Sequence, residues 1–332
     1  MKNCRQLSLV LILTALLSIS CSSKPKALVK KGGIFMGTIC NISLDEGSSE
    51  SIYTGAFNLL SDIDTNLSRT KEGSLIYTLN KEGHVTIEND DYFNLIVRSF
   101  ELAQTTEGAF DPSIGKAVAL WGIGTEDERI PSQEELDAVN DDYTQVVIDT
   151  EKHTITIPKG MEVDLGAIGK GYATDKLIAY FAENGVTRGI INLGGNVYVI
   201  GSKDEGTPWK IGLQKPFDQR GDSFVLLSLS DTAVVTSGAY ERYFEKDGTI
   251  YCHILDPKTL YPAQTDIQSS TIIGPDATLC DALSTTCFIL GKEKALALLD
   301  TAFPEVSALF LLSDNSIATT PQFPYAYQEI AP

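Results

Sequence analysis

The sequence predicts an α+β domain that consists mainly of antiparallel β-sheet with flanking helices. Short segments rich in β-branched and aromatic residues follow one another closely between residues 145 and 273, as in a sheet built from hairpins. Asp247-Gly248 lies between two such segments, at 242–246 and 249–253, and is the strongest hairpin signal in the chain. Helical patterns do not alternate regularly with the strands, which argues against a parallel βαβ sheet.

The individual elements follow from hydrophobic spacing. Residues 34–43 alternate in polarity and predict a strand, whereas 50–66 and 90–106 place apolar side chains at helical spacing. Ser132 and Glu135 form a capping box at the start of a short helix. Further strands are expected at 145–149, 154–157, 189–193, 197–200, 210–213, 224–229, 233–236, 270–273 and 308–312, and further helices at 172–183, 276–290 and 292–302.

Composition and charge limit the classes of function. The chain has 332 residues, of which 43% are hydrophobic and 21% charged, a composition typical of globular proteins. Its 26 basic and 44 acidic residues give a net charge of −18. Nucleic-acid binding requires a basic surface, so we expect no nucleic-acid partner. An anionic substrate would need a local cation or a metal ion.

The N-terminus has the pattern of an export signal. Lys2 and Arg5 precede an apolar stretch, residues 7–19, that is too short for a comfortable membrane span. The stretch ends just before Cys21, and this junction resembles a bacterial lipobox. We therefore expect a signal peptide at 1–20, a lipid-anchored tether at 21–33 and a folded domain at 34–332. The alternative is an ordinary signal peptide with a chance cysteine.

This interpretation assigns the cysteines and the location. Cys4 would be removed, and acylation of Cys21 would anchor the protein on the extracytoplasmic, periplasmic side of the cell membrane. Removing residues 1–20 would leave 24 basic and 44 acidic residues and a net charge of −20. The chain has no C-x-x-C pair and three histidines, so a zinc site is not expected. The other cysteines are expected to be small buried apolar residues: Cys40, Cys252, Cys280 and Cys287.

A glycine-rich segment at 163–171 leads into a predicted helix. Its glycines allow close approach of the backbone to a ligand, and free N–H groups at a helix N-terminus suit phosphate. Lys170 adds a positive charge there. The spacing matches neither the P-loop nor the Rossmann pattern. The alternative is a tight turn from strand to helix.

Three further segments carry side chains suited to chemistry. Asp281, Ser284 and Thr285 lie on one helix face and offer hard oxygen ligands for Mg²⁺, unless they are only solvated or capping groups. His253 is suited to act as a general base, although a lone histidine is more often structural. In the segment 108–113, Phe110 offers a contact for a ring system, while Asp111-Pro112 is also a plain helix start.

Taken in order, these motifs closely resemble the ApbE family, the bacterial FAD:protein FMN transferases. Each motif is weak alone, but together they span the chain from about residue 34 onward. The matching segments are Phe35-Met36-Gly37-Thr38, Leu67-Ser68, 108–113, 164–171, Asn192-Leu193-Gly194-Gly195-Asn196, Thr236-Ser237-Gly238, 253–257 and 281–285.

The resemblance implies a fold, a reaction and partners. The fold would be that of ApbE, which is T-fold-like. Family members bind FAD and Mg²⁺ and transfer FMN to a threonine hydroxyl of a target flavoprotein, releasing AMP and leaving a phosphoester link. This chain would then be a phosphorus-group transferase. Its acceptors would be flavoprotein subunits of membrane redox complexes, such as the sodium-pumping NADH:quinone reductase and related electron-transfer complexes.

The resemblance also implies roles for individual residues. His253 matches the proposed base, and Asp281 is implied to be both catalytic and a metal ligand. The other implied Mg²⁺ ligands are the backbone oxygen of Ala167 and the side chains of Ser284 and Thr285. The implied flavin or FAD contacts are Met36, Thr70, Ala109, Phe110, Asp111, Asp164, Lys170 and Leu255.

One position departs from the family pattern. Many relatives place a tyrosine, whose ring flanks the flavin, where this chain has Thr70. A smaller residue there suggests that water or a second metal is admitted, and that FAD is hydrolysed to FMN and AMP without an acceptor. An FAD pyrophosphatase is therefore one alternative function, and a flavin-binding lipoprotein without catalysis is another.

Overall fold

A computed structural model describes residues 27–204, 206–219 and 221–330. The expected signal peptide, Cys21 and the other tether residues up to 26 lie outside these residues, whereas residues 27–33 of the expected tether are described. Within the described part of the chain, every helix is too short or too polar to cross a bilayer.

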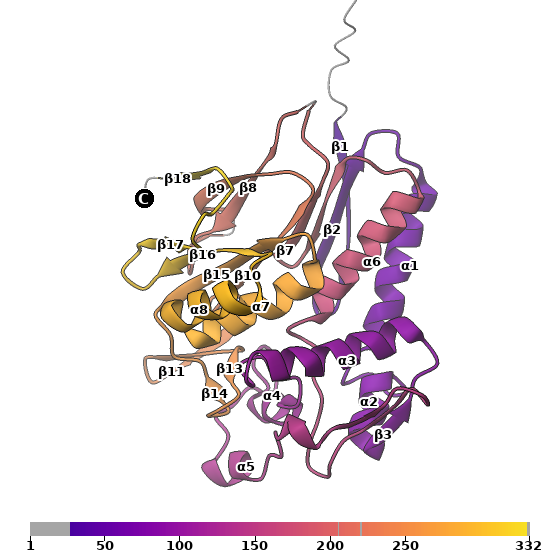
Figure 1. Ribbon diagram of the computed structural model, residues 1–332, viewed down its shortest axis with the longest axis vertical. Coiled ribbons are helices and arrows are strands. Elements are labelled where there is room, and N and C mark those ends of the chain that lie inside the picture. Colours follow the sequence, from indigo (N-terminus) through magenta and orange to yellow (C-terminus); the bar gives the residue numbers. More distant parts are fainter. Residues whose placement is uncertain (1–26, 205, 220, 331–332) are drawn as a thin grey trace, which may run out of the picture.

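A fully antiparallel eight-stranded sheet forms the centre of the molecule (Figure 1). This arrangement confirms the predicted α+β class with mainly antiparallel sheet. The strand order is β1 (Leu28–Phe35), β2 (Thr38–Asp45), β6 (Gly189–Leu193), β7 (Asn196–Ile200), β10 (Thr232–Gly238), β15 (Ile267–Gly274), β16 (Ser307–Leu312) and β17 (Ile317–Thr319).

The sheet is covered on both faces. Helices α1 (Glu50–Asn66), α6 (Gly169–Glu183), α7 (Ala277–Leu290) and α8 (Lys292–Ala302) pack on one another and on one face. A three-stranded sheet of β8 (Trp209–Gln214), β9 (Ser223–Leu229) and β18 (Tyr327–Glu329) covers the other face. Each face of the sheet therefore has its own hydrophobic core. Along β16, Phe310 packs in the core under the helices, whereas Leu309 and Leu311 pack in the core under the three-stranded sheet. Consecutive strand residues point to opposite faces, so a continuously apolar strand contributes side chains to both cores.

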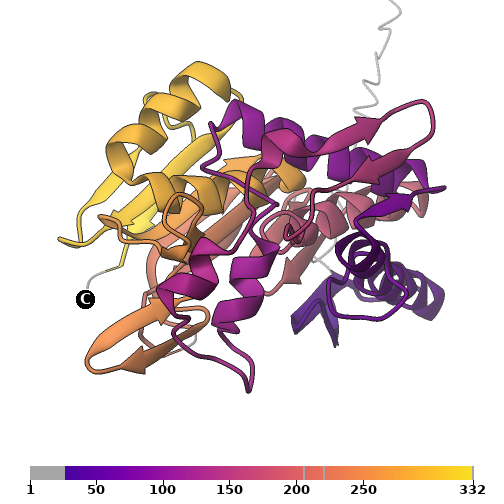
Figure 2. The same cartoon turned by 90° about the horizontal axis from the view of Figure 1, so that it is seen from below.

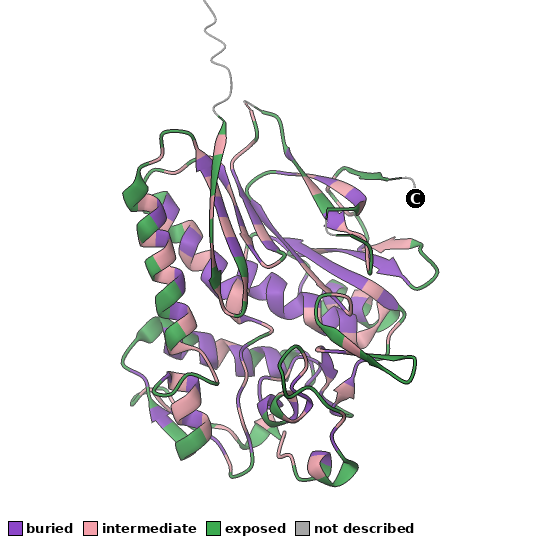
Figure 3. Cartoon of the chain, turned by 180° about the vertical axis from the view of Figure 1, so that it is seen from behind, coloured by how far each residue is buried: buried purple, intermediate pink, exposed green. Residues whose placement is uncertain are grey.

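Helix α7 is the most deeply buried helix near the site. It is coloured as buried over most of its length in Figure 3, and it crosses β10 and β15 directly. Asp276 caps it by accepting a hydrogen bond of 2.8 Å from the N–H of Leu279. Capping by an aspartate satisfies one of the free N–H groups that every helix N-terminus leaves. The sequence predicted this helix from residue 276, and the structure confirms it.

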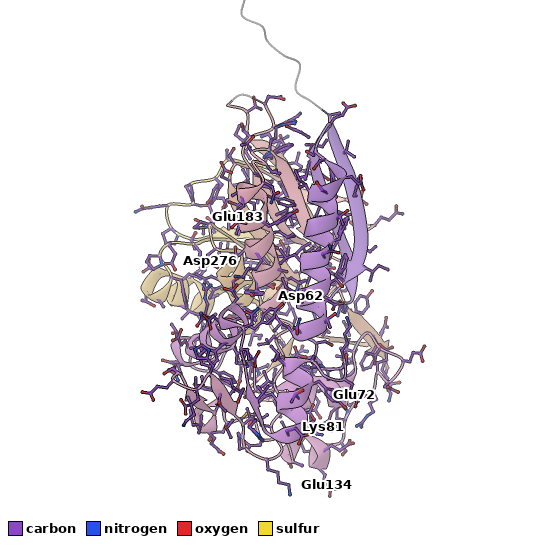
Figure 4. All side chains as sticks on the ribbon, turned by 90° about the vertical axis from the view of Figure 1, so that its right-hand side faces the viewer. Asp62, Glu72, Lys81, Glu134, Glu183 and Asp276 are labelled. Atoms are coloured by element: carbon purple, nitrogen blue, oxygen red, sulfur yellow. The ribbon has the colours of Figure 1, made fainter. Side chains whose placement is uncertain are left out.

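A smaller region lies below the sheet in Figure 1. It contains α2 (Leu75–Glu82), α3 (Asp90–Thr105), α4 (Gly115–Trp121), α5 (Gln133–Asp137), a 3-10 helix (Tyr143–Gln145) and a sheet of β3 (His84–Thr86), β5 (Thr154–Thr156) and β4 (Val147–Asp149). Figure 4 shows α1, marked by Asp62, above α2, marked by Lys81. Trp121 anchors a separate apolar cluster with Leu136, Leu255 and Leu260.

Two small hairpins complete the fold. The Asp247-Gly248 signal is confirmed by β11 (Tyr243–Lys246) and β12 (Thr249–Cys252), which pair antiparallel and project from the body in Figure 2. The pair β13 (Leu255–Asp256) and β14 (Tyr261–Pro262) follows at once. Tyr251 of β12 packs on Trp121, with ring centroids 5.7 Å apart, and this contact ties the first hairpin to α4.

Several boundaries differ from the predicted ones. The segment 34–43 is not one strand but parts of β1 and β2, joined by a turn at Met36-Gly37, and the sheet begins at Leu28 rather than at residue 34. Edge strand β1 is partly exposed and carries Gly32-Gly33, so it has no clear polarity alternation. Helix α6 begins at Gly169 rather than at 172. Helices α2 and α4 were not predicted.

The four remaining cysteines behave as expected. Cys40, Cys252, Cys280 and Cys287 are buried and unpaired in the described part of the chain. Burial raises the pKa of the Cys40 thiol to about 11. These thiols therefore stay protonated at neutral pH and act as small core residues.

Candidate functional site

One cavity of about 970 Å³ collects nearly all of the residues singled out in the sequence. It lies where the β1–β2 turn, the start of α6, the face of α7 and the β12–β13 connection converge. The predicted residues on its wall are Met36, Thr70, Ala109, Phe110, Asp111, Asp164, Ala167, Lys170, His253, Leu255, Asp281 and Thr285. Ser284 does not line it, and Cys21 lies outside the described residues.

The cavity floor depends on close contact between α6 and α7. The N–H of Gly171 donates a hydrogen bond of 2.9 Å to Oδ2 of Asp281. A Cβ atom on Gly171 would stand 2.2 Å from the carbonyl oxygen of Ala277, so only glycine fits. Asp175 of α6 also accepts hydrogen bonds from the N–H groups of Ala277 and Thr278. The glycine-rich segment therefore sets the approach of the two helices.

Asp281 presents one carboxylate oxygen to the cavity. The residue is 2% exposed, and its Oδ1 lies 3.6 Å from Nζ of Lys170. Thr285 follows one turn later and lines the same wall. Ser284 is fully buried, and its hydroxyl lies 2.7 Å from that of Ser237 and 2.9 Å from the carbonyl oxygen of Asp281. Ser237, which does line the cavity, therefore stands where Ser284 was expected, and metal binding by Ser284 stays a prediction.

Asp164 is held in place by its own neighbours. Its Oδ1 accepts a hydrogen bond of 2.6 Å from the N–H of Gly166, and its Oδ2 forms a 2.8 Å ion pair with Arg69. The side-chain amide of Asn80, in α2, forms two hydrogen bonds with the backbone of Val163, the residue before Asp164. It accepts from the N–H of Val163 at 2.7 Å and donates to the Val163 carbonyl at 2.9 Å. Helix α2 thus positions the glycine-rich segment, although the sequence did not reveal that helix.

The segment from Ala109 to Asp111 lies beside Asp164. The N–H of Asp164 donates to the carbonyl of Pro112 at 2.9 Å, which joins two motifs distant in the sequence. Asp111 accepts hydrogen bonds from the N–H and the hydroxyl of Ser113. Burial nevertheless raises the pKa of Asp111 to about 6, because desolvation outweighs those hydrogen bonds. The Asp111 carboxyl is therefore partly protonated just below neutral pH.

His253 is oriented by the backbone of Arg242. The imidazole Nδ1 of His253 lies 3.2 Å from the carbonyl oxygen of Arg242, and the backbone N–H of His253 donates to the same oxygen at 3.0 Å. Burial first, and then the positive charge of Arg242, lower the pKa of His253 to about 4. The imidazole is therefore neutral at physiological pH. Because a carbonyl only accepts, Nδ1 carries the proton and Nε2 is the free base.

The turn at Met36-Gly37 is clamped over the cavity. Met36 has φ 50°, a left-handed conformation that is uncommon for a residue with a side chain. Its N–H donates to Oδ1 of Asp64 at 3.0 Å, and the carbonyl of Gly37 accepts from Arg242 at 3.0 Å. Thr70 lies exposed on the wall, with its hydroxyl 3.2 Å from that of Ser68. Thr70 thus presents a small polar side chain to the cavity.

The charges on the wall nearly cancel. Five carboxylates line the cavity, namely Asp64, Asp111, Asp164, Glu241 and Asp281, together with four cationic side chains, Arg69, Lys71, Lys170 and Arg242. Two of the cations form ion pairs inside the wall, Arg69 with Asp164 and Lys71 with Asp64. The charged side chains of the wall therefore offer no net positive charge to a dianionic ligand, and a bound cation would supply it.

The donor set suits Mg²⁺ better than a transition metal. Within residues 27–204, 206–219 and 221–330, His, Cys, Asp and Glu form no group of three or more that could hold a metal ion. Asp281 with Thr285 and the Ala167 carbonyl supplies hard oxygen ligands, and Mg²⁺ typically combines few protein ligands with waters and substrate phosphates. The residues present fit such an ion.

Some wall residues were not assigned roles from the sequence. Arg69 and Arg242 stand next to quoted motifs, and Ser237 and Asn196 lie inside them. No spacing rule identifies a single Arg, Ser or Asn as a site residue. The only sequence signal for these residues was therefore their position in or near a motif. Asn80 lies outside every motif and is identified only by its contacts.

Comparisons with known proteins agree with one another. The model of the ApbE family matches residues 36–310. The FAD:protein FMN transferase of Treponema pallidum is 33% identical over 306 residues, covering 86% of this chain and 84% of its own length. The enzyme of the same name from Haemophilus influenzae is 30% identical over 323 residues, covering 91% and 92%.

Solved structures with this fold carry related names. The ApbE protein from Thermotoga maritima superposes with a TM-score of 0.81 at 32% identity, over 89% of this chain and 98% of that one. The flavin transferase ApbE from Vibrio cholerae gives a TM-score of 0.76 at 26% identity, over 90% and 99%. The similarity of fold therefore extends over about nine tenths of this chain.

Proposed function

This chain belongs to the ApbE family, and we propose that it transfers FMN from FAD to a threonine hydroxyl of an acceptor protein, releasing AMP. The relatives named FAD:protein FMN transferase support the transfer of a flavin group to protein. The observation that carries the proposal is the single cavity in which Asp281, Thr285 and the neutral His253 face a helix N-terminus.

The cavity suits FAD in size and chemistry. Its volume of about 970 Å³ is at the upper end for small-molecule sites. Buried Phe110, with Ala109 and Leu255, offers apolar surface for the flavin ring, while the start of α6 and Lys170 favour phosphate. Met36 adds a flexible side chain from the clamped turn. One cavity therefore offers both an apolar surface for a flavin ring and groups that bind a diphosphate.

The bonds of the proposed reaction balance as follows. The threonine oxygen attacks the phosphorus on the FMN side of the diphosphate, and the P–O bond to the AMP phosphate breaks. Nε2 of His253 takes the proton of the threonine, and AMP leaves with the electrons of the broken bond. A phosphoester then links FMN to the acceptor. Because little covalent work falls to the protein, positioning and charge neutralisation dominate the rate.

We propose Mg²⁺ as the cofactor, with Asp281, Thr285 and the Ala167 carbonyl as its protein ligands. When bound, it would neutralise the diphosphate oxygens and stabilise the leaving group. The near balance of charge on the wall supports this assignment. Lys170 stands 3.6 Å from Asp281 and adds a fixed positive charge on the same side of the cavity.

The location and the partners are also proposals. The signal-like residues 1–20 and Cys21 support a lipid anchor on the extracytoplasmic side of the membrane. A tethered enzyme there would meet flavoprotein subunits of membrane redox complexes. A Cys21→Ser variant should leave the membrane fraction and appear soluble in that compartment. If it stays membrane-bound like the wild type, the anchor is not at Cys21.

A direct assay tests the proposed reaction. Purified protein is incubated with FAD, Mg²⁺ and a candidate acceptor subunit, and denaturing gels are read for flavin fluorescence. We expect a fluorescent acceptor band, AMP in the supernatant, and loss of both with a chelator. AMP without a fluorescent band would instead identify an FAD pyrophosphatase, for which exposed Thr70 is the favouring observation. Flavin binding without either product would identify a non-catalytic flavin-binding protein.

A further inference from the structure

Asn196 has a buried amide group with one unpaired end in the cavity wall. It begins β7 directly after the Gly194-Gly195 turn, is 1% exposed, and lines the cavity. Its Nδ2 has no hydrogen-bond partner in the described part of the chain. A buried polar group without a partner carries the full penalty of losing its water. The presence of a polar side chain at this buried position therefore requires an explanation.

The other end of the amide points to the start of α6. Oδ1 of Asn196 lies 3.2 Å from the hydroxyl of Thr174, which also lies 2.9 Å from the carbonyl of Lys170. Thr174 is one turn along α6 from Lys170. The amide thus sits against the first turns of the helix, next to the lysine that faces Asp281. Within the described ranges, the Thr174 hydroxyl is the partner of this end of the amide, and the Nδ2 end has none.

The start of α6 is arranged for an anion. Its N-cap residue, Ile168, provides no side-chain cap. The N–H of Gly169 bonds to the carbonyl of Leu165 and that of Gly171 to Asp281, and Lys170 stands between these two residues on the cavity wall. The helix dipole and Lys170 both favour negative charge at this point. An N–H donor beside them that lacks a protein acceptor completes the set of groups that a phosphate would engage.

We propose that Asn196 is a further ligand-binding residue, whose Nδ2 donates a hydrogen bond to a phosphate oxygen of the bound dinucleotide. The inference rests on the proposed function, because that function supplies the diphosphate. It assigns a role to the last residue of the Asn192–Asn196 motif. The unpaired N–H donor then destabilises only the ligand-free protein, and the bound phosphate oxygen supplies the missing acceptor.

A matched comparison separates binding from folding. Asn196→Leu keeps the approximate shape and removes the unpaired amide, while Asn196→Asp puts a carboxylate in its place. Ser270→Ala is the control, because Ser270 of β15 is also fully buried with an unpaired hydroxyl, lies opposite Ser237, and does not line the cavity. Removing either unpaired group should preserve or raise the thermal midpoint of the ligand-free protein, by up to about 2–4 °C.

Two measurements are made on the full mature chain. Thermal unfolding without ligand reports the fold, and flavin fluorescence titration with FAD and Mg²⁺ reports the Kd. We expect Asn196→Leu to raise the Kd about tenfold or more, since a hydrogen bond to a charged acceptor is lost. Asn196→Asp should bind more weakly still. Ser270→Ala should bind FAD as the wild type does.

The outcomes distinguish the inference from the proposed function. An Asn196→Leu protein that folds and binds FAD within twofold of the wild type overturns the inference. Equal or tighter binding by Asn196→Asp also overturns it, because the amide would then face a cation. If Asn196→Leu does not accumulate, Asn196→Ala is measured in the same way. A wild-type protein that binds no FAD contradicts the proposed function itself, whatever the variants do.

Discussion

The N–H of Gly171 and the carboxylate of Asp281 are joined by a hydrogen bond of 2.9 Å between the first turn of α6 and the second turn of α7. Two motifs separated by more than a hundred residues in the sequence are thereby fixed at contact distance. The glycine removes the obstacle of a side chain, and the aspartate receives an N–H that a helix start leaves free. The carboxylate is oriented before any ligand binds.

Gly171→Ala should break this contact. The added Cβ would stand 2.2 Å from the Ala277 carbonyl and 2.7 Å from Cβ of Asp281, so α6 and α7 must separate. We expect a loss of about 1–3 kcal/mol in the free energy of unfolding, as for other overpacked sites, and a collapse of transfer activity. Denaturant titration measures the first. Gly169→Ala, in the same turn with nothing within 4 Å of its Cβ, should cost no stability.

Asp281→Asn separates the charge of this residue from its hydrogen bond. An amide oxygen can still accept from the N–H of Gly171, so the fold should remain. The loss of the negative charge should weaken Mg²⁺ binding by at least about tenfold, since even outer-shell partners of a metal cost that much. Thermal shift with increasing Mg²⁺ measures the affinity, and Asp300→Asn on exposed α8 is the control. An unchanged Mg²⁺ response would remove Asp281 from the ligand set.

His253→Ala should lower the transfer rate and leave FAD binding intact. Loss of a general base typically costs about 10²–10⁴-fold in rate, and the imidazole contributes nothing to the phosphate-binding groups at α6. Single-turnover transfer to the acceptor measures the rate, and flavin fluorescence measures the Kd. His84→Ala, on exposed β3 outside the cavity, should transfer normally. Transfer at the wild-type rate by His253→Ala would exclude the base assignment.

Burial lowers the pKa of His253 from its ordinary value of 6.5 to about 4 in the folded protein, and this shift predicts two pH dependences. The rate of transfer should fall near pH 4 rather than near 6.5, because the base is lost only when the folded imidazole takes up a proton. Stability should also fall between pH 6.5 and 4, because the unfolded chain binds the proton first in that window. Above pH 6.5 this residue makes no pH-dependent contribution.

A comparison with His253→Gln isolates the effect on stability. Asp111 acts in the opposite direction, since its raised folded pKa of about 6 stabilises the protonated form as the pH falls through 6. Both proteins contain Asp111, so the difference between their unfolding curves reports His253 alone. Identical losses of stability between pH 6.5 and 4 in both proteins would mean that His253 is not desolvated.

Much of the architecture follows from local patterns. The hairpin at Asp247-Gly248 and the helix predicted at 276–290 follow from local patterns, and the structure confirms both. The β1–β2 turn was missed because Gly37, with φ 66°, is the local turn signal, whereas Met36, with φ 50°, is not a usual residue for the preceding position. The hydrogen bonds that hold this turn are made with Asp64 and Arg242, which lie far away in sequence.

The site shows the same division between local and long-range information. The resemblance implied roles for Asp281, Thr285 and His253, each of which lies in a contiguous motif, and the structure brings the three to the wall of one cavity. The resemblance could not reveal that Ser284 is fully buried, with its hydroxyl 2.7 Å from that of Ser237, a residue of β10 that lines the cavity. This contact depends on how α7 lies across β10. The spacing of residues along a helix predicts which side chains share a face. Which of their hydroxyl groups is buried against the neighbouring strand depends on tertiary packing.

Thr70→Tyr tests whether the open side of the cavity admits water. Thr70 is exposed on the cavity wall, and its hydroxyl lies 3.2 Å from that of Ser68, so this position presents a small side chain where a tyrosine would present a ring. We expect the wild type to release AMP slowly from FAD and Mg²⁺ without an acceptor, because water can then replace the threonine hydroxyl. A tyrosine ring at this position should suppress that release and preserve transfer to the acceptor. Chromatographic measurement of AMP, with Thr86→Tyr on exposed β3 as the control, decides the question: no AMP from the wild type rules out hydrolysis, and equal release from both proteins shows that Thr70 does not control access of water.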